Sequence, residues 1–182
     1  MTPIFTGKGD KGQTGFLGSG KISKNSARIE AVGSVDEAAA SLGYARALTD
    51  SEKIKSIILQ VQKQLYVLMS EISTASNESD QFDKITENDL SWLENQIKDL
   101  EDIVEMPGDF IIPGESPASS ALAVARTVVR RAERRTITLL QVGEKFKPIL
   151  IAYLNRLSSL IFVLEVYETS LSGRGLRLAK ED

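Results

Sequence analysis

The sequence of 182 residues contains neither cysteine nor histidine. A disulfide, an imidazole metal site, a Ser-His-Asp or Cys-His catalytic centre and an HExxH zinc site are therefore excluded. Aromatic residues make up only 6% of the chain, too few to suggest a surface that stacks nucleic-acid bases. Any catalysis must use carboxylates, lysines, arginines, hydroxyls and backbone amides.

An excess of basic charge is also missing. The chain has 22 Lys and Arg against 25 Asp and Glu, a net charge of −3, which argues against generic binding to nucleic acid or to an anionic membrane. The first twenty residues lack the apolar core of a signal peptide, and no uninterrupted run of about 18 apolar residues occurs. We therefore expect a cytoplasmic protein with no membrane segment and no nucleic-acid partner.

Apolar residues recur at helical spacing in five segments, which predicts a single all-α domain over residues 1–182, built as a five-helix bundle. The expected helices cover about 26–47, 51–75, 87–100, 117–140 and 146–169, with Ser51, Thr86 and Ser116 at their N-termini as caps. A loop at 1–25 precedes the bundle at 26–170, and a tail at 171–182 follows it. The last helix is apolar on nearly all sides, which predicts that it lies at the centre of the bundle or against a second subunit.

Nearly half of the glycines lie in the first 25 residues, too many for a helix or a stable strand. Free backbone N–H groups together with Lys8 and Lys11 form a combination that binds phosphate oxygens, although a merely flexible N-terminus fits this composition equally well. Residues 15–22 nearly match a P-loop, but Ile22 stands where a magnesium-binding Ser or Thr is required. We therefore exclude a Walker-type NTPase.

Arginines are concentrated on the expected fourth helix. They are Arg126, Arg130, Arg131, Arg134 and Arg135, with Glu133 as the one carboxylate among them. A solvated helix with local ion pairs would show the same composition. The excess of guanidinium groups nevertheless predicts an anion supplied from elsewhere, and several arginines together with Lys8 would hold a triphosphate.

Two polar positions interrupt the apolar stripes of other helices. Asp36 lies on or beside the stripe of the first helix: if buried, its carboxylate needs a cation, for which Arg126 is a candidate, and at the edge of the stripe it would reach water. Asn155 lies in the apolar last helix and, if buried, needs hydrogen-bond partners, which an interhelical bond would supply.

Five collinear segments together resemble the PduO-type ATP:cob(I)alamin adenosyltransferases. They are Thr6–Thr14, Glu30–Glu37, Phe110–Gly114, Ala125–Arg134 and Tyr153–Leu157. The resemblance implies a homotrimer that binds ATP, with Mg²⁺ on its phosphates, and a corrinoid between neighbouring subunits. It implies transfer of the 5′-deoxyadenosyl group of ATP to cob(I)alamin with release of triphosphate. It also implies a flavoprotein reductase that acts on cob(II)alamin and an adenosylcobalamin-dependent enzyme as further partners.

The resemblance also assigns roles by motif position. ATP contacts fall on Thr6, Gly7, Lys8, Gly9, Thr14, Gly15 and Lys24, and on Arg130, Arg131, Glu133, Arg134 and Asn155. Asp36 and Arg126 would pair across the subunit interface near the corrinoid. Phe110 would lie below the corrin and exclude base and water from the cobalt, whereas core packing is the alternative interpretation for this residue.

The sequence departs from the family pattern at Ala38-Ala39, Ala123 and Glu115, which bears on the corrinoid pocket. The alternative function is therefore a non-catalytic nucleotide or corrinoid carrier with the same fold. A helical module that binds an acidic protein or RNA is a third possibility, and the acidic net charge counts against RNA.

Overall fold

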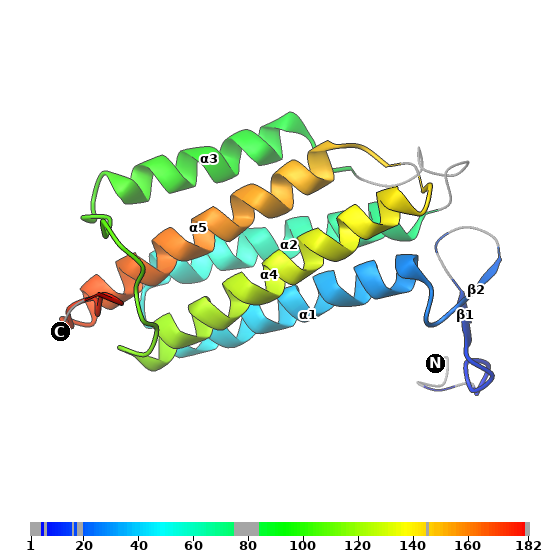
Figure 1. Cartoon of the computed structure of the whole chain (residues 1–182), viewed down its shortest axis with the longest axis horizontal. Coiled ribbons are helices and arrows are strands. Elements are labelled where there is room, and N and C mark those ends of the chain that lie inside the picture. Colours follow the sequence, from blue (N-terminus) through cyan, green and yellow to red (C-terminus); the bar gives the residue numbers. More distant parts are fainter. Residues whose placement is uncertain are drawn as a thin grey trace.

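The computed structural model describes residues 5, 7–15, 17, 20–74, 84–144 and 146–180. Within them the elements are β1 (Gln13–Gly15), β2 (Lys21–Ser23), α1 (Ala27–Leu48), α2 (Glu52–Ser73), α3 (Glu87–Glu101), α4 (Pro117–Gln141) and α5 (Ile149–Leu171). The helices lie side by side along the long direction of the molecule, and the small sheet stands beyond the first turn of α1 (Figure 1). The predicted all-α bundle of five helices is confirmed.

The helix starts follow from local sequence. Ser26, Ser51 and Ser116 have extended backbones, and each side chain accepts a hydrogen bond from the amide three residues on. At the start of α3 the Thr86 amide donates to the Asp89 carboxylate at 2.9 Å. A cap of this kind contributes about 1 kcal/mol to the free energy of unfolding. The caps predicted at Ser51, Thr86 and Ser116 are confirmed.

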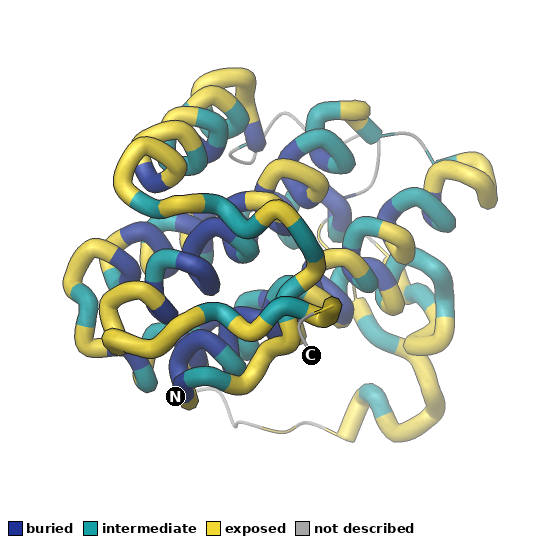
Figure 2. Tube along the Cα trace, turned by 60° about the vertical axis from the view of Figure 1, so that its left-hand side comes forward, coloured by how far each residue is buried: buried dark blue, intermediate teal, exposed yellow. Residues whose placement is uncertain are grey.

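The core lies where the helices face one another (Figure 2). α4 packs between α1 and α5, α3 covers the other side of α5, and α2 packs on α1. Burial raises the pKa of the Tyr153 phenol, whose hydroxyl donates to Oε1 of Gln64 at 2.8 Å. By length and composition α5 could cross a membrane, but most of its apolar stretch is buried inside the bundle. The last helix was expected either at the centre of the bundle or against a second subunit, and within the chain α5 lies at the centre of the bundle.

Two segments differ from the sequence-based expectation. The glycine-rich start was expected to hold no strand, yet β1 and β2 pair as an antiparallel ladder with Thr14 opposite Ile22. Gly12 precedes the ladder with φ 75, a value that glycine adopts without steric cost. The last helix begins at Ile149 rather than near 146, because Pro148 occupies its N-cap position and proline suits a helix start but not its interior.

Candidate functional site

The N-terminal loop encloses a cavity of about 370 Å³. Its lining consists of Lys8, Gly9, Gln13, Thr14, Gly15, Gly20 and Lys21. Four residues predicted to contact ATP, Lys8 among them, thus line one cavity, and Lys21 adds a second ammonium group. The lining comes from the loop and its strands alone, so this cavity is separate from the helices that carry the predicted arginines.

Lys24 is a further basic side chain of this loop and lies outside the lining of the cavity. Its amide donates to the carbonyl of Gly12 at 2.9 Å, and its ammonium lies so close to Gly9 that a Cβ built on Gly9 would be 2.9 Å from Lys24 Nζ. Gly7 has φ 67, which favours glycine at that turn. The remaining predicted contact, Thr6, lies outside the described residues.

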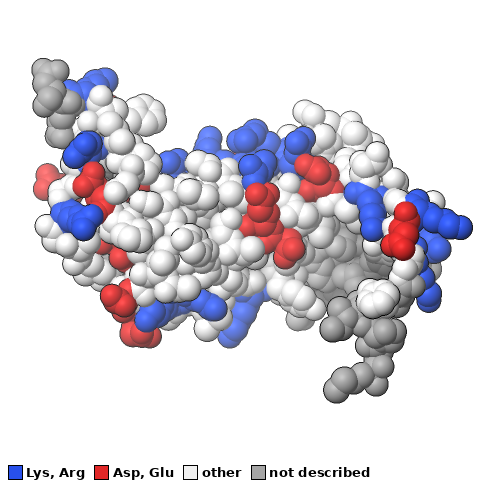
Figure 3. All heavy atoms as spheres, turned by 90° about the horizontal axis from the view of Figure 1, so that it is seen from below, with Lys and Arg blue, Asp and Glu red and all other residues white. Residues whose placement is uncertain are grey.

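Four arginines of α4 divide into two sets, and the fifth, Arg126, is described below. Arg131 forms an ion pair with Glu37, and Arg135 lies 3.1 Å from Glu30, so α1 supplies carboxylates to the two arginines that face it. On the face of the molecule in Figure 3, acidic side chains accordingly lie among the basic ones. Two of the anions that the arginine excess was expected to need are thus carboxylates of α1, and the sequence could not name them because it does not show which helix packs beside α4.

Arg130 and Arg134 form the second set. Both are exposed, and no ion pair of the described residues involves either. Beside them, the Asn155 side-chain amide donates to Glu133 Oε1 at 3.1 Å and links α5 to α4. Asn155 is exposed, so its amide is not a buried group that requires partners. The predicted interhelical hydrogen bond of Asn155 is nevertheless present and is confirmed. Arg130 and Arg134 are therefore the α4 cations available to an external anion.

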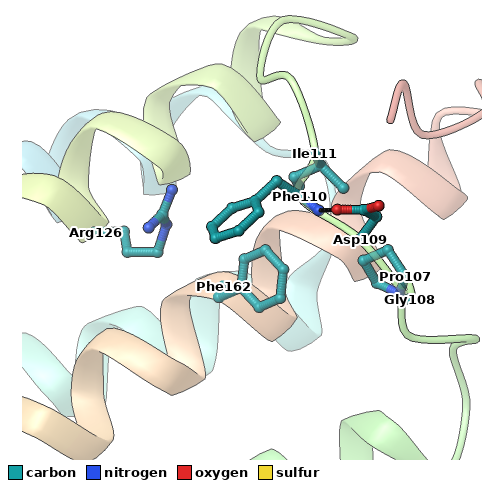
Figure 4. A pocket seen from close by; sticks show the side chains of 7 residues that line it. All are labelled: Pro107, Gly108, Asp109, Phe110, Ile111, Arg126 and Phe162. Carbon is teal, nitrogen blue, oxygen red and sulfur yellow. Dashed lines mark hydrogen bonds between the residues drawn. The ribbon is translucent and has the colours of Figure 1, made fainter. Parts of the chain in front are cut away.

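A second cavity, of about 430 Å³, lies beside Phe110. It is lined by residues 107–111 together with Arg126 and Phe162. Figure 4 shows the Phe110 ring pointing toward Arg126, with the Phe162 ring next to it. Phe110 is 83% exposed, so the core-packing interpretation of this residue is wrong.

A third cavity, of about 370 Å³, adjoins the second. Arg126 and Phe162 line it as well, and here Arg130 and Ser158 join them. The Arg126 guanidinium carbon lies 5.7 Å from the centre of the Phe162 ring, a distance at which cation and ring attract. Arg126 and Phe162 thus form a wall shared by the cavity beside Phe110 and the cavity beside Arg130, and the latter is lined by one carboxylate, Glu101, as well as by the two arginines.

A buried carboxylate, Glu165, lies behind this wall. Its side chain is 2% exposed, and its Oε2 is 3.7 Å from Arg126 Nε; neither of these two atoms has a hydrogen-bond partner. Burial raises the pKa of Glu165 to about 7, although the Arg126 charge opposes the rise. Sequence reasoning missed this residue, and the available signal was a lone carboxylate inside the apolar stretch Leu164-Glu165-Val166.

Asp36 is exposed on α1, which agrees with the edge position and not with a buried one. Within the chain the partner of Arg126 is Glu165, so the two members of the predicted pair do not meet in the single chain. Among the departures from the family pattern, Ala38 and Ala123 are buried and belong to neither cavity that Arg126 lines. Those two departures therefore leave the walls of both cavities unchanged.

Comparisons with known proteins show which family the chain resembles in sequence and fold. The family model for cobalamin adenosyltransferase matches residues 4–168. The corrinoid adenosyltransferase of Bacillus subtilis is 34% identical over 176 residues, which cover 94% of this chain and 89% of that protein.

Two similar solved structures come from Lactobacillus reuteri. A phenylalanine-to-alanine variant of its PduO-type ATP:corrinoid adenosyltransferase, complexed with cobalamin and ATP, aligns with a TM-score of 0.92 at 31% identity, covering 98% of this chain and 100% of the other. An arginine-to-lysine variant complexed with ATP aligns with a TM-score of 0.90 at 32% identity, covering 97% and 100%. The chain therefore belongs to the cobalamin adenosyltransferase family.

Proposed function

We propose that this chain is a transferase that moves the 5′-deoxyadenosyl group of ATP onto the cobalt of cob(I)alamin and releases triphosphate. The observation that carries the proposal is the wall of Arg126 and Phe162 shared by two cavities. The cavity beside Phe110 suits a flat macrocycle, and the one beside Arg130 suits a polyphosphate, because guanidinium groups bind phosphate oxygens in bidentate fashion. Both substrates would then meet at the wall.

The reaction makes few demands on protein side chains. Cobalt(I) of the substrate donates an electron pair to C5′, the Co–C5′ bond forms, and the C5′–O bond breaks with its electrons leaving on triphosphate. No general base is required, which suits a chain without histidine. The protein must hold C5′ near the cobalt and stabilise the charge that develops on the triphosphate.

In this proposal Arg130, Arg131 and Arg134 bind phosphate oxygens, Arg131 after exchanging its contact with Glu37. Glu133 and Asn155 complete the helical side of the site. Mg²⁺ bound to the phosphates would add positive charge there, and the Glu133 carboxylate supplies the type of oxygen that this ion prefers. Arg130 and Arg134 are exposed and form no ion pair within the described part of the chain, which supports the assignment.

The loop cavity holds the other side of the nucleotide through Lys8, Gly9, Thr14 and Gly15, and Lys24 adds its ammonium beside Gly9. Gly7 and the undescribed Thr6 extend this group by motif position. Since loop residues alone line that cavity, we propose that the loop of one subunit meets α4 of its neighbour in a homotrimer. The exposed Asp36 would then pair with Arg126 of the neighbour near the corrinoid.

Phe110 has a separate role in the proposal. Its ring would occupy the space below the corrin and displace the lower ligand, which leaves four-coordinate cobalt(II), a species easier to reduce than the five-coordinate one. The 83% exposure of the residue leaves its ring free to meet a substrate. A cytoplasmic flavoprotein reductase would supply the electron, and an adenosylcobalamin-dependent enzyme would receive the product.

The test supplies ATP, Mg²⁺ and chemically reduced cobalamin, and follows adenosylcobalamin by absorbance and triphosphate by mass spectrometry. We expect equal amounts of both. Binding of both substrates without either product would make the chain a carrier and refute the proposed enzymatic activity.

The Phe110→Ala variant should keep its rate on cob(I)alamin and lose most of its rate when cob(II)alamin must be reduced in the site. Sedimentation as a monomer with full activity would contradict the shared site.

A further inference from the structure

The segment that carries Phe110 is held by the end of the chain. Residues 174–180, here called the strap, run beside it: Ile111 forms an antiparallel bridge with Leu178. The Ile112 amide donates to the carbonyl of Arg177 at 2.8 Å, and the Ala179 amide donates to the carbonyl of Phe110 at 2.8 Å. The sequence suggested only a short, charged tail at this place.

The backbone amide of Phe110 is linked to the same strap through the side chain of Asp109. The Phe110 amide donates to Asp109 Oδ1 at 2.9 Å, drawn dashed in Figure 4. Asp109 Oδ2 lies 2.9 Å from Lys180 Nζ. The hydrogen bond from Lys180, with that from the Phe110 amide, holds the pKa of Asp109 below its usual range, so the carboxylate is ionised at neutral pH.

The far end of the segment is fastened as well. The carbonyl of Glu115 accepts a hydrogen bond from the Arg174 guanidinium, and Arg177 Nε lies 3.7 Å from Glu115 Oε1. Glu115 is one of the positions at which this chain departs from its family. In this chain the departure supplies a partner for the strap.

Phe110 needs such an external support. The side chain is 83% exposed, so packing in the core does not fix it, and no helix or strand element includes the residue. The backbone is therefore a main support of the ring, and both polar backbone groups of Phe110 end on the strap, the carbonyl directly and the amide through Asp109.

We propose that the strap positions the Phe110 ring against the corrin, with Asp109 and Lys180 as positioning residues. The inference rests on the role of Phe110 in the proposed function. A ring held less firmly would displace the lower ligand less completely. Loss of either positioning residue should therefore lower the share of four-coordinate cobalt(II). Loss of Lys180, which lines neither cavity, should leave the attack of ready-made cobalt(I) on ATP intact.

The experiment compares full-length Asp109→Asn and Lys180→Gln with the wild type. The share of four-coordinate cobalt(II) is measured by electron paramagnetic resonance with cob(II)alamin, ATP and Mg²⁺. Rates are measured both from cob(II)alamin with a reductant and from pre-reduced cob(I)alamin. Because an exposed ion pair is a modest interaction, we expect the four-coordinate share and the cob(II)alamin rate of both variants to fall about two- to fivefold. The cob(I)alamin rate of Lys180→Gln should stay unchanged, since Lys180 lines neither cavity of the proposed site.

Two control variants sharpen this comparison. Lys180→Arg keeps a cation for Asp109 and should behave as the wild type. Lys63→Gln removes an exposed cation of α2, away from the strap, and should also change nothing. Thermal unfolding of every variant shows whether the fold is intact.

Each other result contradicts a definite part of the argument. A wild-type four-coordinate share in both Asp109→Asn and Lys180→Gln, with a loss in Phe110→Ala, would overturn the strap and leave the proposed function standing. An equal fall of Lys180→Gln on the cob(I)alamin and cob(II)alamin routes would also overturn it, since a general structural defect acts on both. A wild-type protein that forms no adenosylcobalamin from cob(I)alamin would overturn the proposed function and the strap together.

Discussion

Replacing Glu165 by glutamine should change how the stability of the protein depends on pH. The Glu165 carboxylate is buried behind Arg126, and burial raises its pKa from 4.5 to about 7. Glutamine has nearly the same shape and is neutral at every pH, so it imitates the protonated acid. Because the chain has no histidine or cysteine, few other groups titrate between pH 5 and 8, and the effect of one residue becomes visible.

The sign and size follow from proton linkage. Between pH 4.5 and 7 the folded protein keeps a proton that the unfolded chain has lost, so the free energy of unfolding of the wild type falls as pH rises. The pKa rises from 4.5 to about 7, and each pKa unit corresponds to about 1.36 kcal/mol. We expect Glu165→Gln to lie within about 1 kcal/mol of the wild type near pH 5 and to exceed its free energy of unfolding by about 2 kcal/mol more at pH 8 than at pH 5.

The measurement is urea unfolding of both proteins from pH 5 to 8, at a fixed protein concentration because subunit association also stabilises. Glu94→Gln is the control, since Glu94 pairs with Arg156 at 3.0 Å on the surface, where such pairs contribute little. The control should show a pH-independent difference of a few tenths of a kcal/mol from the wild type. A difference between Glu165→Gln and the wild type that is the same at pH 5 and pH 8 would refute the reasoning.

Three further changes test other parts of the molecule. Arg130→Ala should lower kcat/KM for ATP about 10- to 100-fold, as expected for one charged hydrogen bond, with little change in melting temperature; unaltered ATP kinetics would remove Arg130 from the phosphate site. Gly9→Ala should weaken ATP binding in calorimetry, because the new Cβ would lie 2.9 Å from Lys24 Nζ, and the same change in a Lys24→Ala background should have a smaller effect. Ser116→Ala removes the acceptor for the Ser119 amide at 3.0 Å and should lower the free energy of unfolding by about 1 kcal/mol; urea curves that coincide with those of the wild type would contradict the cap.

The sequence by itself determined the five helices and the starts of the first four. The period of 3.6 residues and the caps at Ser51, Thr86 and Ser116 act over a few residues, so they can be identified without knowing the fold. The motif resemblance identified Arg126, Arg130 and Phe110, and the structure places Arg126 in the walls of cavities beside both of the others. Whether these residues bind ATP and corrinoid as assigned stays a prediction.

The tertiary structure alone decided which charges meet. Glu30 and Glu37 neutralise arginines of α4 about a hundred positions away in the chain, and they leave Arg130 and Arg134 exposed. Only the fold brings Glu165 behind Arg126, and only the fold lays the strap beside Phe110. Helix formation depends on near neighbours in sequence, whereas an ion pair or a bridge depends on which distant surfaces pack together, and no local pattern records that choice.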